Sequence, residues 1–148
     1  MEALMKKFLL LAVVAAVFGV SSVQAAGGCA PCLATCILGD PRIGLYMNEG
    51  KSIETEDWIV FAGNVLVGLG WVYAGINAYE KAQNAKGFCV GALWGRRAGS
   101  EINSTKLRTK EILLCIPILN IYPCIALPLE AFGGKTMSAV IQEEGLSR

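Results

Sequence analysis

The stretch that decides the fold class is residues 58–79, WIVFAGNVLVGLGWVYAGINAY, which contains no charged side chain. As a continuous helix it would measure roughly 33 Å, which is enough to cross a bilayer. Thr55 precedes the stretch as a candidate N-cap, and Glu56 and Asp57 occupy positions where the helix dipole favours negative charge. The pattern therefore predicts a helix that spans a membrane or is embedded in it.

Small residues recur on one face of this predicted helix. They are Gly63, Gly70, Ala74 and Ala78, which are separated by seven, four and four positions. Small side chains allow another backbone to approach closely inside a membrane. We therefore expect these four residues to form a helix-packing surface through which the protein associates with itself or with a membrane protein partner.

A second apolar stretch, residues 112–132, carries a single charge, Glu130. Pro117, Pro123 and Pro128 interrupt it, and an interior proline removes a backbone hydrogen bond. The stretch predicts either a kinked span or two short helices that meet near residues 120–123. The expected fold class is all-α, with two membrane-spanning or membrane-embedded helices. The alternative is a compact exported α-helical hairpin bundle, in which the two stretches close against each other in water.

The beginning of the chain has the pattern of a secretory signal peptide. Lys6 and Lys7 precede the apolar run 8–20, and small residues follow up to Ala25. We expect cleavage after Ala25, which predicts an exported protein in the cell membrane or cell envelope. An uncleaved anchor and a lipoprotein acylated on Cys29 are the alternatives. Residues 26–148 then form a single helical membrane domain that ends in a short amphipathic helix at 137–144.

Composition supports a membrane environment. Of the 148 residues, 54% are apolar and 17% are charged, and the formal net charge is +1. Soluble domains usually carry about a quarter charged residues, so we expect the lipid bilayer as a partner. The nearly balanced charges give no global field for nucleic acid, and no nucleic-acid partner is expected.

The distribution of charge predicts a sidedness. Residues 26–57 carry two basic and five acidic side chains, whereas residues 80–111 carry seven basic and three acidic ones. Basic loops favour the cytoplasmic side of a membrane. The counts predict that 26–57 is external, that 80–111 is cytoplasmic, and that both termini of the mature chain are outside.

An internal repeat is the most specific feature of the sequence. A shift of 55 residues places Arg42, Asn48 and Lys51 over Arg97, Asn103 and Lys106. With one deletion, Asp57 then aligns with Glu111. We interpret this as a duplicated unit covering about 28–81 and 87–135, with the two copies in opposite orientation. The six polar residues are either turn, cap and snorkelling residues within each unit or the lining of a polar site between the units.

Cysteines are the main candidates for chemistry. Those considered for disulfides or redox activity are Cys29, Cys32, Cys36 and Cys89. The first two have the two-residue spacing of thiol–disulfide exchange motifs, and a Cys36–Cys89 link is a further possibility. Cys115 and Cys124, in the second apolar stretch, are expected to pack as small hydrophobic side chains.

No catalytic constellation is evident. Histidine is absent, which removes the commonest general base and the commonest metal ligand, so no enzyme activity, cofactor or metal is expected. The sequence predicts a small exported integral membrane protein with a structural or assembly role. The alternatives are a small pore or transport element built from inverted repeats, and a periplasmic thiol–disulfide protein that uses Cys29 and Cys32.

Overall fold

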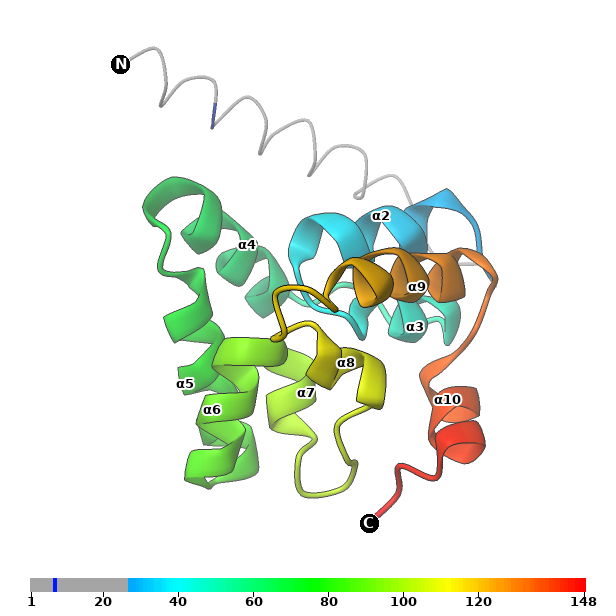
Figure 1. The fold of residues 1–148 in the computed structure, drawn as a ribbon. Coiled ribbons are helices and arrows are strands. Elements are labelled where there is room, and N and C mark those ends of the chain that lie inside the picture. Colours follow the sequence, from blue (N-terminus) through cyan, green and yellow to red (C-terminus); the bar gives the residue numbers. More distant parts are fainter. Residues whose placement is uncertain (1–6, 8–26) are drawn as a thin grey trace.

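A computed structural model describes Lys7 and residues 27–148, and the described part is helical, which confirms the all-α class (Figure 1). The predicted signal peptide lies outside the described residues except for Lys7. Nine helices occur in residues 27–148: α2 (Cys29–Leu38), α3 (Ile43–Asn48), α4 (Thr55–Val67), α5 (Gly70–Ala82), α6 (Ala85–Trp94), α7 (Arg96–Ser100), α8 (Thr109–Leu113), α9 (Ile121–Phe132) and α10 (Met137–Glu144).

The predicted continuous helix over 58–79 is wrong, because the stretch folds back as the hairpin α4–α5. Gly68 ends α4 in the left-handed conformation with φ 72°, which glycine adopts without the penalty of a Cβ atom. The Gly68 and Leu69 amides donate to the carbonyls of Asn64 and Gly63, each at 3.2 Å. Glu54, and not Thr55, is the N-cap residue of α4.

The second apolar stretch forms two short helices, as one of the two sequence interpretations expected. α8 ends at Leu113, the chain turns through residues 114–120, and α9 begins at Ile121, so the break starts earlier than predicted. Pro123 lies in the first turn of α9, where a missing amide costs nothing. In the part of the chain that the structure describes, no helix has both the length and the apolar character needed to cross a bilayer.

The two segments predicted on opposite sides of a membrane are in contact. Arg97, from the basic segment 80–111, donates to Asp57, from the acidic segment 26–57, at 2.6 Å. The predicted two-sided arrangement of these segments is therefore wrong. Its physical reason is that charge counting treats each segment as solvated, whereas here opposite charges of the two segments neutralise each other.

The fold contains two antiparallel helix pairs, α2 with α9 and α5 with α6. α2 packs against α9, and the Gly28 amide donates to the Phe132 carbonyl at 2.8 Å where α2 begins and α9 ends. α5 packs against α6, and the short helices α3 and α7 follow α2 and α6 (Figure 1). We call residues 27–82 the first half and residues 85–148 the second half. Each half has the order pair-forming helix, short helix, apolar hairpin.

Close backbone approaches hold α6 and α7 together. A Cβ atom at Gly99 would lie 2.4 Å from the amide nitrogen of Gly91 and 2.5 Å from the carbonyl oxygen of Gly87. Only glycine fits there. α10 occupies the residues predicted for the C-terminal amphipathic helix, and its buried Met137 and Val140 pack in one cluster with Leu45 of α3.

Candidate functional site: buried charges between the two halves

Several charged side chains are buried in the interior of the molecule. Those with less than a tenth of their surface exposed are Asp40, Arg42, Asp57, Arg96, Arg97, Arg108 and Glu111. Burying a charge is costly unless it is paired and hydrogen-bonded. The arrangement of partners therefore decides whether this interior is stable.

Arg42 is fully buried and uses all five of its N–H donors. Two reach Glu111 in a bidentate pair, Nε to Oε1 at 2.7 Å and Nη2 to Oε2 at 2.9 Å. The others reach Glu101 at 3.1 Å, Thr105 at 2.9 Å and the Lys106 carbonyl at 3.1 Å. Burial alone would lower the pKa of Arg42, but the hydrogen bonds and charge of Glu111 raise it above its ordinary value. The guanidinium therefore stays charged.

In the second half, Arg97 pairs with a buried carboxylate of the first half, as Arg42 pairs with one of the second. Its Nη2 donates to Asp57 Oδ2 at 2.6 Å and to the Ser52 carbonyl at 3.2 Å. Arg96 adds Nε to Asp57 Oδ1 at 2.8 Å and Nη2 to Glu54 at 2.7 Å. Asp57 thus accepts hydrogen bonds from both Arg96 and Arg97, and Glu54 also pairs with Arg96.

The pairing is reciprocal between the halves. Asp57 and Glu111 are both the third residue of their helices, and each accepts the amide of its own N-cap residue, at 3.1 and 2.9 Å. Arg42 of the first half neutralises Glu111 of the second, and Arg97 of the second neutralises Asp57 of the first. In the alignment at a shift of 55 residues, Arg42 stands over Arg97, and after one deletion Asp57 stands over Glu111.

The two asparagines of the repeated motif also bind across the halves. Asn48 Nδ2 donates to the carbonyls of Ala131 and Lys135 at the end of α9, at 2.8 and 2.7 Å. Asn103 Nδ2 donates to the Ala82 carbonyl at the end of α5, at 2.8 Å. The motif arginines and asparagines therefore lie at the junction of the halves.

The lysines of the motif do not belong to this buried cluster. Lys51 and Lys106 are both exposed. The Lys51 ammonium lies 4.2 Å from the centre of the Tyr46 ring. The Tyr46 hydroxyl in turn donates to Glu101, which links α3 to the segment after α7.

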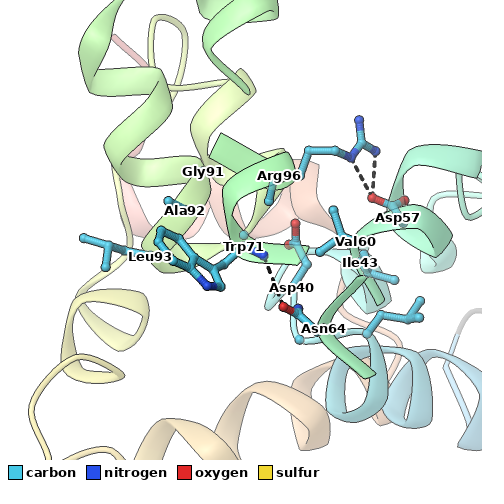
Figure 2. A pocket seen from close by; sticks show the side chains of 14 residues that line it. Asp40, Ile43, Asp57, Val60, Asn64, Trp71, Gly91, Ala92, Leu93 and Arg96 are labelled. Atoms are coloured by element: carbon cyan, nitrogen blue, oxygen red, sulfur yellow. Dashed lines mark hydrogen bonds and ion pairs between the residues drawn. The ribbon is translucent and has the colours of Figure 1, made fainter. Parts of the chain in front are cut away.

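Asp40 is a member of the cluster that the sequence analysis missed. Its two carboxylate oxygens accept the amides of Arg42 at 3.0 Å and Arg97 at 2.9 Å, so it bridges the starts of α3 and α7. Burial raises its pKa to about 6 against the lowering effect of these amides. Figure 2 shows Asp40 and Trp71 lining one pocket. The sequence signal for Asp40 was its place just before Arg42 in the aligned motif. At the corresponding place the second half has Gly95.

The predicted packing face is used inside the chain. A Cβ at Gly70 would lie 2.0 Å from the Val60 carbonyl oxygen, so Gly63 and Gly70 let α4 and α5 meet. Ala74 and Ala78 are buried, and a Cβ at Gly91 of α6 would lie 2.4 Å from the Ala78 Cβ. α6 of the same chain covers this face, so self-association would need another surface.

The six cysteines, all within residues 27–148, are free thiols. Cys29, Cys32 and Cys36 lie on α2, and Cys89 lies on α6. The expectation that Cys115 and Cys124 are packed is wrong, because both are exposed. Cys115 falls in the connection after α8, and Cys124 falls in the first turn of α9. Among the described residues, no group of three or more possible ligands is arranged to hold a metal ion.

The buried arginines and carboxylates neutralise one another's charges. Arg108, also fully buried, donates to Glu130 at 2.7 Å and to Glu144 at 2.8 Å, which ties α8 to α9 and α10.

Comparison with protein-family models, curated proteins and solved structures finds no match to this chain.

Proposed function

We propose that this chain is an exported, membrane-embedded protein with a structural or assembly role, held in lipid by its two apolar hairpins. Hairpin 1 is residues 58–79 and hairpin 2 is residues 112–132. The observation that carries the proposal is an inverted polarity. Large apolar side chains are exposed, whereas Arg42, Arg96, Arg97 and Arg108 and the carboxylates of Asp40, Asp57 and Glu111 are buried. Ile118 is 84% exposed, Val67 68% and Ile121 67%.

The exposed apolar side chains gather at the turns of the hairpins. At hairpin 1 they are Val67, Leu69 and Trp71, and at hairpin 2 they are Ile116, Ile118, Leu119, Ile121, Tyr122 and Ile125. Soluble proteins rarely expose apolar side chains in such continuous runs unless something covers them. Because the runs wrap around turns and not along one flat face, a fluid apolar medium fits them better than a single protein partner.

Several backbone amides of the hairpin 1 turn are hydrogen-bonded within the turn. Beyond the two amide bonds that end α4, the Trp71 amide donates to Asn64 Oδ1 at 3.1 Å, and the Trp71 indole donates to the Gly68 carbonyl at 3.1 Å. An unpaired backbone group costs several kcal/mol in a bilayer core. The turn therefore presents apolar side chains while the amides of Gly68, Leu69 and Trp71 are hydrogen-bonded within it.

In hairpin 2, several backbone amides of the turn form short-range hydrogen bonds. The amides of Leu114, Cys115 and Ile116 each donate to a carbonyl three residues earlier, at 3.1 to 3.2 Å. Leu119 and Asn120 both donate to the Ile116 carbonyl, at 3.0 and 2.9 Å. Proline has no amide hydrogen to satisfy, so the prolines of this stretch are compatible with lipid. A hairpin that turns back inside the bilayer needs no helix long enough to cross.

The buried charges also support the proposal. Their reciprocal pairing supports the proposal of a duplicated unit, and it removes charge from the outer surface of the halves. The pore alternative requires a polar path, whereas Arg42 is paired with Glu111 and Arg97 with Asp57. A helical body held together by buried ion pairs, with two apolar hairpins on its surface, suits a role in anchoring or assembly within a cell envelope.

Carbonate extraction of membranes from expressing cells tests the proposal. The parent chain should remain in the membrane pellet, whereas Ile118→Glu should shift the protein largely to the soluble fraction, because a carboxylate at a lipid-embedded position costs about 2–3 kcal/mol. Ile118 is so exposed that the substitution removes little internal packing. Gln142→Glu, which adds the same charge at an exposed position of α10, is the matched control.

A probe measurement reports insertion directly. An environment-sensitive nitrobenzoxadiazole label on Cys115, with the other cysteines replaced by serine, should brighten and shift to the blue when phosphatidylcholine–phosphatidylglycerol vesicles are added. The same label on a Gln142→Cys variant that lacks the native cysteines should change little. Full extraction of the parent chain by carbonate, together with an unchanged Cys115 label, would contradict the proposal.

A further inference from the structure

The antiparallel pair α2–α9 places two thiols at the same level. The register is set where the Gly28 amide donates to the Phe132 carbonyl at 2.8 Å. Cys36 lies eight residues after Gly28, and Cys124 lies eight residues before Phe132. Because both helices rise by the same distance per residue, Cys36 and Cys124 come opposite each other. Figure 1 shows α2 and α9 side by side and running in opposite directions.

The surroundings of Cys36 agree with this register. Both Cys36 and Cys124 are exposed, so no other side chain among residues 27–148 keeps an oxidant away from them. Burial and the neighbouring thiol of Cys32 raise the pKa of Cys36, and Cys124 is close enough to raise it further. A raised thiol pKa disfavours the thiolate and so favours a disulfide that persists over one that exchanges rapidly. This is the behaviour of a structural bridge.

We propose that Cys36 and Cys124 form a disulfide that links the first half of the chain to the second under oxidising conditions. The reaction is thiol–disulfide exchange with a small disulfide such as oxidised glutathione. The Cys124 thiolate attacks the glutathione disulfide and releases one glutathione, and the Cys36 thiolate then attacks the Cys124 sulfur of the mixed disulfide and releases the second. Two protein thiols are oxidised, one glutathione disulfide is reduced, and both protons end on the glutathione thiols.

The bridge fits helix geometry. A disulfide needs Cα atoms about 4.4–6.8 Å apart, and two helices packed with their axes about 8–10 Å apart bring facing positions into this range. The pairs Cys29–Cys32 and Cys32–Cys36 lie within α2, so a bridge between them would not link the first half to the second. The inference does not depend on lipid insertion, since it rests on the register of α2 and α9.

Peptide mapping of the full chain tests the bridge. The protein is equilibrated with oxidised glutathione, alkylated with N-ethylmaleimide, digested with trypsin and examined by mass spectrometry without reduction. The peptide that ends at Arg42 should be linked to peptide 111–135. Its mass should be about 2 Da below the sum of the two peptides with N-ethylmaleimide on Cys29, Cys32 and Cys115 only. Reduction with dithiothreitol should release both peptides.

Matched variants identify the sulfurs. Cys115 lies in the same tryptic peptide as Cys124, so Cys115→Ser should keep the link and Cys124→Ser should abolish it. Cys32→Ser should keep the link, and Cys36→Ser should abolish it. The proposal is overturned if the parent chain yields no link between the two peptides, or if the link survives in Cys124→Ser and is lost in Cys115→Ser. Circular dichroism of each variant separates a lost bridge from a lost fold.

Discussion

Replacing Arg42 with methionine removes the centre of the reciprocal charge cluster. The side chain is fully buried and donates five hydrogen bonds, two of them to Glu111, which is also fully buried. Removing one partner of a buried ion pair costs about 3–5 kcal/mol, because the other charge is left without compensation. Glu111 keeps the amide of Arg108 at 2.9 Å as a donor. We therefore expect Arg42→Met to lower the free energy of unfolding by about 4 kcal/mol.

A double-mutant cycle separates the pair from the packing. Arg42→Met, Glu111→Met and the double variant are unfolded in urea with far-ultraviolet circular dichroism as the readout, in the detergent used for purification. The double variant should be more stable than additivity predicts by about 2–3 kcal/mol. The half-exposed pair Lys135–Glu143, at 2.6 Å, is the control and should show coupling below about 1 kcal/mol. Single effects at Arg42 and Glu111 that add within about 0.5 kcal/mol would refute the reasoning.

Two further predictions concern Asp40 and Gly99. Burial raises the pKa of Asp40 from 3.8 to about 6, so the folded protein holds a proton there that the unfolded chain releases at lower pH. The free energy of unfolding of the parent chain should therefore fall relative to that of Asp40→Asn as pH rises from about 4 to about 6, by on the order of 3 kcal/mol. A constant difference across urea titrations in that pH range would contradict this. Gly99→Ala should destabilise the fold by about 2–3 kcal/mol, because the added Cβ meets backbone atoms of Gly91 and Gly87 at 2.4 and 2.5 Å. Gly133→Ala, whose Cβ would meet only carbonyl oxygens at 3.3 Å and beyond, is the control for thermal unfolding, and equal melting temperatures for the two variants would count against the packing argument.

Helix formation was predictable because its signals are local. The acids at the starts of the two apolar stretches, Asp57 and Glu111, do accept amide hydrogens at helix N-termini. The fold-back at Gly68 was not predicted. Glycine is common in membrane helices, so its presence allows a continuous helix as well as a turn. What selects the turn here is the contact between Gly63 and Gly70, which exists only once α5 has folded back on α4.

The site was predicted in part. The alignment singled out Arg42, Arg97, Asn48 and Asn103, and the structure brings all four to the junction of the halves. Asp40 was missed because its importance comes from bridging two backbone amides that are far apart in the chain. No pattern of side-chain types records such a bridge.

The amino-acid sequence by itself determined that the chain forms helices, where uncharged stretches separate charged segments, and which residues share a motif. These properties follow from side-chain polarity and from interactions within one or two helical turns. Only the tertiary structure decided that each arginine of the motif meets the carboxylate of the opposite half, 69 residues away for Arg42 and 40 for Arg97. Such partners are chosen by the desolvation of the whole cluster, because a buried charge is stable only where every neighbouring group that neutralises it is brought there by the fold.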